Sequence, residues 1–222
     1  IYEVAKTDPV YLAAVKDGGC EIPVSNGEIA NCNLASVCLN KFVKYNVDDK
    51  IYYFDYNELY DVVQIIADNL NQVIDITTYS SKDTYNSNMK ARPMAIGVQG
   101  FADVLSKMHL SYEDEETKIL NHDIFETIYF SALTKSNQLS KKYGPYHYFK
   151  GSPYEKGQLH FDFYDDTYLS GKWDWDGLRK NIIKYGVRNS LMVACMPTAS
   201  SAQLYGNTES FEPRTYNVYT RK

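Results

Sequence analysis

A short apolar run near the end of the chain constrains the fold more than any other feature. Every residue of 191–195 is apolar, and Pro197 ends the run. A short run without polar alternation is typical of a strand that is buried on both faces. Such a strand needs helices on both sides of its sheet. We therefore expect an α/β fold with a mostly parallel sheet, either open or closed into a barrel.

Periodic apolar positions predict the helices that cover this sheet. They fall in residues 55–74, 93–108, 120–139 and 173–185. Asp55 is expected to cap the first helix, and Glu58 to reach back to the Asp55 backbone in a capping box. Gly144 and Gly186 are expected to end the third and fourth helices.

The segments between these helices predict the remaining elements. Residues 28–43 contain a strand candidate, residues 77–88 are expected to form a polar loop, and residues 146–171 a long irregular connection. Gly97 and Gly100 lie inside the second helical pattern, where glycine is costly, so we expect them to allow close packing.

Composition excludes several classes of protein. No apolar run reaches the eighteen or so residues of a membrane span, and the first residues lack a signal-peptide pattern. We therefore expect a cytoplasmic protein without a membrane partner. The net charge of -5 offers no basic surface, so no nucleic-acid partner is expected.

A hydroxyl-rich turn follows the apolar run directly. Thr198, Ala199, Ser200 and Ser201 are predicted to open a short helix, whose first N–H groups would form an anion seat suited to phosphate. The alternative is that Thr198 or Ser200 only caps the helix.

Cys20, Glu21 and Cys32 form a second candidate group. A thiol beside a carboxylate suits redox or general-base chemistry, although an intracellular cysteine is more often a small buried hydrophobic residue. Cys38 and Cys195 are interpreted as core residues. The four histidines lack metal-ligand spacing, so no metal is expected.

These passages, in order, resemble the large catalytic subunit of class I ribonucleoside-diphosphate reductase, most closely the eukaryotic and viral type. The resemblance covers about residues 21–222. It rests on CNLAS at 32–36, RPMAIGVQGFAD at 92–103, IFETIY at 124–129, YGVRNSL at 185–191 and MPTASSAQ at 196–203. Residues 209–213 and 219–221 continue it.

The resemblance implies that residues 20–222 are part of a ten-stranded α/β barrel, while residues 1–19 stay unassigned as a non-native or diverged segment. It implies an oxidoreductase that makes deoxyribonucleoside diphosphates for DNA synthesis. A thiyl radical removes the ribose 3′ hydrogen, a glutamate takes the 3′-hydroxyl proton, and two thiols reduce the 2′ position. Cys32 matches one of that thiol pair, and residues 198–201 match the substrate diphosphate seat.

The family's radical cysteine lies in an Asn-Leu-Cys-x-Glu-Ile pattern. Aligning Glu21 and Ile22 with this pattern puts Gly19 at the radical position and Cys20 one residue later. A shift of one residue points a side chain elsewhere. Glu21 is therefore the more direct match, and Cys20 is the candidate radical carrier.

The resemblance also implies partners and cofactors. The substrate is a ribonucleoside diphosphate, the reductant is thioredoxin or glutaredoxin, and the full-length chain forms a homodimer or a higher oligomer. No cofactor is expected in this chain. The radical comes from a separate metal-containing small subunit, ATP and dNTP act as effectors, and the second thiol, the effector sites and the radical-relay tyrosines are expected outside this chain.

Two readings remain open. In the first, the chain is part of an active reductase. In the second, it is a catalytically inactive remnant or homologue that keeps nucleotide or partner-subunit binding. In either case we expect the 222 residues to be inactive on their own, because a radical reaction needs its whole relay.

Overall fold

The computed structural model describes residues 27–165 and 167–216. Cys20 and Glu21 therefore lie outside the described residues. The strands are β1 (Leu34–Cys38), β2 (Val43–Asn46), β3 (Ile51–Phe54) and β4 (Ala95–Gln99). The α-helices are α3 (Tyr56–Ile76), α4 (Lys82–Ala91), α5 (Phe101–Met108), α6 (Glu115–Tyr143), α7 (Trp175–Tyr185) and α8 (Ala199–Tyr205). Short 3-10 turns are η1 (Leu39–Lys41), η2 (Pro153–Lys156) and η3 (His160–Phe163).

A parallel pair of strands forms the centre of the fold. β1 pairs with β4 in a register that runs from Leu34 opposite Ala95 to Cys38 opposite Gln99. β2 and β3 form a separate antiparallel hairpin. Residues 191–194 follow the other edge of β4, where Met94 N donates to the Leu191 carbonyl at 3.1 Å. A parallel bridge joins Ile96 to residue 193.

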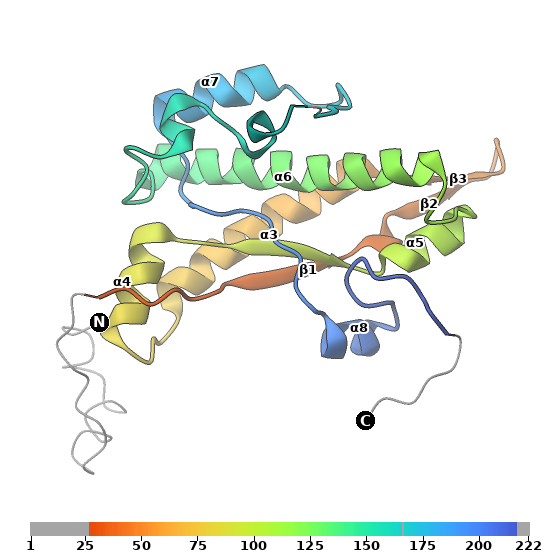
Figure 1. Ribbon diagram of the computed structural model, residues 1–222, viewed down its shortest axis with the longest axis horizontal. Coiled ribbons are helices and arrows are strands. Elements are labelled where there is room, and N and C mark those ends of the chain that lie inside the picture. The colour runs from red at the N-terminus through yellow and green to blue at the C-terminus, as the bar shows by residue number, and fades with distance from the viewer. Residues whose placement is uncertain (1–26, 166, 217–222) are drawn as a thin grey trace, which may run out of the picture.

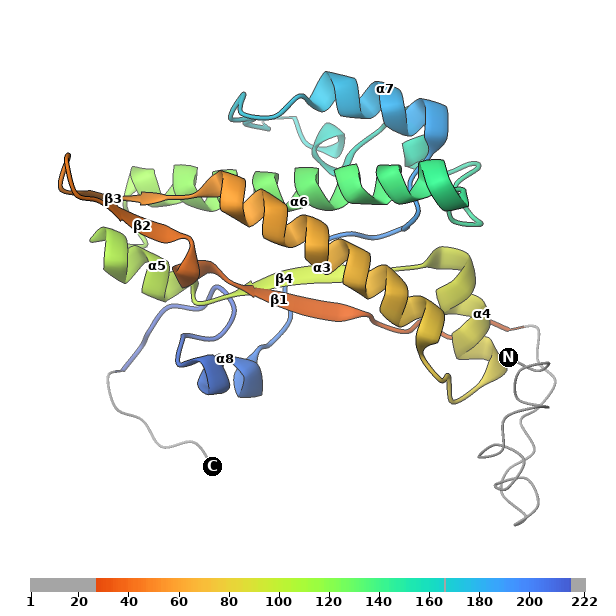
Figure 2. The ribbon, with the colours of Figure 1, turned by 180° about the vertical axis from the view of Figure 1, so that it is seen from behind.

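The helices lie in layers about these strands. α6 packs along α3, α7 packs on α6, and α3 contacts both β1 and β4 (Figure 1). Figures 1 and 2 both show α8 on the side of the β1–β4 pair away from α6 and α7. The apolar core lies where α3 and α6 meet the sheet, and Ile96, Val98 and Val63 are fully buried in it.

The mixed helix and strand composition agrees with the expected α/β class. The strand predicted between residues 28 and 43 is confirmed as β1. Within the described residues, however, the strands form two-stranded sheets and no closed barrel. The apolar run at 191–195 is also not buried on both faces, because Leu191 is 64% exposed while Met192 is buried. Its one bridge among the described residues joins it to β4.

Three of the four predicted helices are confirmed as α3, α6 and α7. Asp55 caps α3 by accepting a hydrogen bond from Glu58 N at 2.9 Å. The expected return bond is not made, because Glu58 pairs instead with Lys44 at 2.5 Å and the Asp55 N–H donates to the Phe42 carbonyl. Gly144 ends α6 with a φ of 81°, which favours glycine.

Two predictions between α3 and α6 are wrong. The expected polar loop contains α4, which begins with a capping box between Ser81 and Thr84. The helix expected from residue 93 begins only at Phe101, because residues 95–99 form β4. Gly97 does allow close packing, since a Cβ there would lie 2.7 Å from the Ala194 carbonyl oxygen.

The length and the apolar character of a helix decide whether it could span a membrane. Among residues 27–165 and 167–216, none of the helices combines the length and the apolar character needed to cross a lipid bilayer.

Candidate functional site

The predicted anion seat lies at the carboxyl ends of the parallel strands. The segment beside β4 runs parallel to it and leads into Thr198 and α8, whose first residues are Ala199, Ser200 and Ser201. The first N–H groups of any helix have no acceptor within the helix. The carboxyl ends of parallel strands are also where α/β folds bind ligands. The turn at 198–201 therefore follows the segment beside β4, and its role as an anion seat stays a prediction.

Hydrogen bonds to the segment after α8 and to β4 hold the side chains of the turn. Thr198 is 4% exposed, and its hydroxyl accepts a hydrogen bond from Ser210 N at 2.9 Å. Thr198 is the N-cap residue of α8, as the capping alternative expects, but its side chain makes no capping hydrogen bond. The Ser201 hydroxyl lies 3.2 Å from Gln99 Oε1 and 3.1 Å from the Thr198 carbonyl oxygen. Ser200 is exposed.

An aspartate on α5 anchors the segment that follows α8. Asp103 Oδ2 accepts hydrogen bonds from the Thr208 backbone and hydroxyl at 2.6 and 3.0 Å, and Oδ1 accepts one from Arg214 at 2.7 Å. Burial, together with the nearby Asp103 carboxylate, raises the pKa of Tyr112 to about 12. Tyr112 therefore stays neutral and donates to the Phe211 carbonyl at 3.0 Å.

Cys32 lies at the opposite end of β1 from the seat. It is exposed and comes just before Asn33, whose carbonyl accepts a hydrogen bond from Ala95 N at 2.9 Å. Since β1 spans five residues and each step adds about 3.3 Å, roughly 13 Å of strand separates its first residue from its last. The structure therefore does not bring Cys32 into contact with residues 198–201, and its redox role stays a prediction.

The other described cysteines are not core residues, so that interpretation is wrong. Cys195 is exposed at the surface, although partial desolvation of its thiol raises its pKa. Cys38 is half-buried at the carboxyl end of β1, where its sulfur accepts a hydrogen bond from Gln99 Nε2 at 2.7 Å. The Cys38 thiol thus lies near residues 198–201, and the side-chain amide of Gln99 connects it to the Ser201 hydroxyl.

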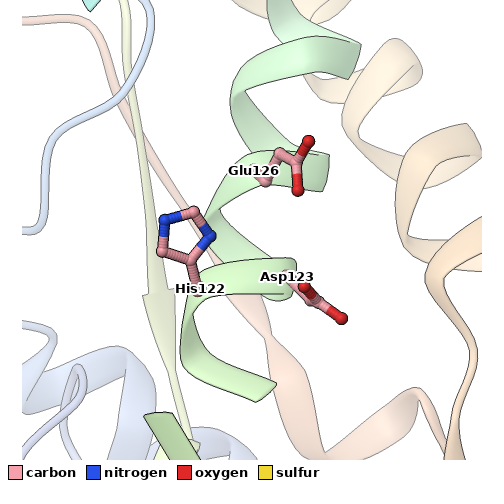
Figure 3. Close-up of side chains that lie close together, drawn as sticks. All are labelled: His122, Asp123 and Glu126. Carbon is pink, nitrogen blue, oxygen red and sulfur yellow. The ribbon is translucent and has the colours of Figure 1, made fainter. Parts of the chain in front are cut away.

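A second group of titratable side chains lies on α6. His122, Asp123 and Glu126 place possible ligand atoms within 4.8 Å of one another. Figure 3 shows the three side chains projecting from one stretch of α6, with the imidazole of His122 to the left of the two carboxylates. Asp123 already pairs with Lys172 at 2.5 Å. A metal cation would have to displace this ammonium group.

Both oxygens of the Glu126 carboxylate are also occupied. Oε1 accepts a hydrogen bond from Trp175 Nε1 at 2.8 Å, and Oε2 accepts one from Ser170 N at 2.9 Å. Burial raises the pKa of Tyr56, and the nearby Asp123 carboxylate raises it further. These contacts connect α6 to the chain before α7 and to the start of α3. They join neighbouring elements, and two of the remaining ligand atoms of the group, His122 Nδ1 and Asp123 Oδ1, are buried without a hydrogen-bond partner.

A cavity of about 560 Å³ lies between α6, the 154–169 segment and residues 191–193. Its walls are mainly aromatic and aliphatic, including Phe125, Tyr129, Phe161 and Trp175. None of the residues that the sequence analysis assigned to chemistry lines it. His122 and Glu126 of the titratable group on α6 do line it, whereas Cys32 and residues 198–201 lie outside its lining.

Sequence reasoning missed Gln99, Cys38 and Asp103 as parts of the seat region. Gln99 and Asp103 contact Ser201 and Thr208 from 102 and 105 positions upstream, and Cys38 contacts Gln99 from 61 positions upstream. No local pattern indicates such contacts. The only available signal was the position of Gln99 just before Gly100, where a strand could end.

Comparison with known proteins adds an independent line of evidence. The family model described as "Ribonucleotide reductase, barrel domain" matches residues 12–222. The "Ribonucleoside-diphosphate reductase large chain" of Cryptosporidium parvum is 48% identical over 198 residues, which cover 89% of this chain and 24% of that protein. The "large chain 2" of Saccharomyces cerevisiae is 45% identical over 221 residues, or 98% of this chain and 25% of the relative.

A viral protein shows the same similarity. The "Ribonucleoside-diphosphate reductase large subunit" of Acanthamoeba polyphaga mimivirus is 45% identical over 192 residues, which cover 86% of this chain and 22% of the relative. The chain thus spans about a quarter of the length of these relatives.

Proposed function

Because the chain belongs to the ribonucleotide reductase large-subunit family, we propose that it forms part of the barrel of an enzyme that reduces ribonucleoside diphosphates to deoxyribonucleoside diphosphates. The resemblance read from the motifs is confirmed by the family match and by relatives from eukaryotes and a virus. The complete ten-stranded barrel, with residues 20–222 inside it, is part of the same proposal.

The proposed chemistry assigns a role to each matched residue. Glu21 takes the proton of the 3′-hydroxyl group, and Cys20, beside the radical position, is the candidate thiyl carrier. Cys32 and a second thiol supply two electrons and two protons. The 2′-hydroxyl then leaves as water, a hydrogen takes its place, and the two sulfurs close to a disulfide. Residues 198–201 hold the diphosphate.

Partners and cofactors of the whole enzyme follow from this assignment. The radical would come from a metal-containing small subunit, and thioredoxin or glutaredoxin would reduce the new disulfide. ATP and dNTP effectors, a dimer or higher oligomer and a cytoplasmic location complete the proposal. All of these concern the whole enzyme, and none of them assigns a cofactor to the described residues.

One observation supports the proposed substrate site most directly. The turn at 198–201 follows the segment beside β4 and starts α8 at the carboxyl ends of parallel strands. The N–H groups of this first turn can bind a phosphate without a cationic side chain. The physical argument and the family motif therefore indicate the same four residues.

The test of this seat is a fixed negative charge placed inside it. In the complete large subunit, Ser200→Asp should weaken binding of CDP at least about fivefold, since two like charges about 4 Å apart repel by roughly 1 kcal/mol even in water. Calorimetric titration measures the dissociation constant. Ser80→Asp adds the same charge at an exposed position before α4 and serves as the control. Equal CDP affinity in both variants would contradict the seat.

A second experiment separates the active enzyme from an inactive homologue. Thiols of the complete enzyme are labelled before and after one turnover with CDP, and the labelled peptides are identified by mass spectrometry. An active reductase should convert Cys32 from a free thiol to a disulfide. An inactive homologue would still bind CDP but would leave Cys32 reduced.

A further inference from the structure

The buried amide of Gln99 connects a thiol to the proposed seat. Gln99 is the last residue of β4 and is 1% exposed. Its Nε2 donates to Cys38 Sγ at 2.7 Å, and its Oε1 accepts a hydrogen bond from the Ser201 hydroxyl at 3.2 Å. The pairing of β1 with β4 places Cys38 directly opposite Gln99. A continuous chain of three polar groups therefore runs from β1 to α8.

The Ser201 hydroxyl and the Cys38 thiol, at the two ends of this chain, share one property. A hydroxyl group and a thiol can each donate or accept a hydrogen bond, whereas the amide between them has one donating and one accepting end. The direction observed runs from Ser201 through Gln99 to Cys38. Rotation of the amide by half a turn would reverse every bond of the chain without leaving any group unpaired.

Reversal would change what Ser201 offers to a ligand. In the observed direction its single hydroxyl hydrogen points to a protein acceptor, either Gln99 Oε1 or the Thr198 carbonyl. In the reversed direction Gln99 Nε2 donates to the Ser201 oxygen, and the hydroxyl hydrogen no longer has Gln99 as an acceptor, so it can turn from the Thr198 carbonyl to an anion. Cys38 then donates its S–H to Gln99 Oε1.

We infer that Gln99 is a positioning residue for the diphosphate seat, and that the Cys38–Gln99–Ser201 chain reverses its hydrogen bonds when a diphosphate binds. This inference rests on the proposed function. An unpaired buried amide is costly, so the reversal requires a partner at position 38 that can both donate and accept. Cys38 meets this requirement.

The test uses isosteric changes at Gln99 in the complete large subunit. Gln99→Met keeps the length of the side chain but removes both polar ends, and should weaken CDP binding about two- to tenfold, the range that one hydrogen bond covers. Gln99→Glu has no donor at neutral pH and should weaken it more, with affinity recovering toward acidic pH as the carboxyl group is protonated. Gln64→Met, on α3, is the matched control, because Gln64 bonds the Ser131 carbonyl far from the seat.

Changes at position 38 test the reversal itself. Cys38→Ser can donate and accept, and should keep the CDP affinity of the unchanged protein. Cys38→Met can accept but cannot donate, so it leaves Gln99 Oε1 unpaired only in the reversed direction and should weaken CDP binding in the same direction as Gln99→Met. Binding of cytidine, which carries no phosphate, should be equal in all these variants. A purely structural role of Gln99 would instead weaken CDP and cytidine alike.

The outcome is separable from that of the proposed function. If Ser200→Asp leaves CDP binding unchanged, the seat itself is wrong. If Ser200→Asp weakens CDP binding while Gln99→Glu does not, only the role of Gln99 is overturned. Equal affinities of Cys38→Ser and Cys38→Met would overturn the reversal.

Discussion

Replacement of Asn33 by leucine should destabilise the protein by about 2–4 kcal/mol. The Asn33 side chain is 7% exposed, and its Nδ2 donates to the Pro93 carbonyl at 2.8 Å and to Asn88 Oδ1 at 3.1 Å. Leucine has a similar size but leaves both of these acceptors unpaired. Each unpaired buried acceptor costs about 1–3 kcal/mol, and the added apolar burial offsets part of the sum. Asn88 keeps one partner, because its Nδ2 also donates to the Tyr79 hydroxyl at 2.8 Å.

Urea unfolding followed by the fluorescence of Trp173 and Trp175 measures this loss. The exposed Asn57 on α3 provides the control, since Asn57→Leu should change the free energy of unfolding by less than about 0.5 kcal/mol. Amide exchange at Ala95 adds a local readout, because its N–H is bound to the Asn33 carbonyl. A loss no larger in Asn33→Leu than in the control would refute the reasoning that the buried amide pair fixes the start of β1.

Two further predictions concern other polar contacts. Asn189→Leu should cost about 2–4 kcal/mol in urea unfolding, because the buried Asn189 amide bonds Asn71 in both directions and accepts from the Ser136 hydroxyl at 2.8 Å; a cost near zero would contradict it. The hydrogen bonds from Arg179 lower the pKa of Asp162 below its unfolded value of about 3.9, so this pair stabilises the fold above that pH and the gain is lost as the pH falls through the folded pKa. In Asp162→Asn, the free energy of unfolding should therefore fall less below about pH 4 than it does in the unchanged protein.

The accuracy of the sequence predictions follows the range of the interactions involved. α3, α6 and α7 were predictable because each combines an apolar stripe with a local cap or a terminating glycine. β4 was not, because its residues also fit helical spacing, and pairing with β1 decides between the two. α4 was missed because its residues are mostly polar, although Ser81 and Thr84 carry its start signal.

The same distinction applies to the candidate site. The helix start at residues 198–201 could be predicted, because hydroxyl residues after an apolar run form a local pattern. Gln99 and Asp103 could not, because they reach Ser201 and Thr208 across about a hundred positions or more. The exposed edge at Leu191 was also unpredictable, since an apolar run does not reveal which of its faces the described residues cover.

The way α8 is attached indicates which part of the seat can adjust. Within α8 only Ala202 is fully buried, whereas Leu204 is 81% exposed and Tyr205 is 61% exposed. Polar contacts to Gln99 and Asp103 therefore hold this region more than apolar burial does. Segments with few buried apolar contacts open at lower free energy than the core. Since β1 and β4 are fixed by the core beneath α3, a ligand that rearranges hydrogen bonds at the turn can shift α8 without disturbing the strands.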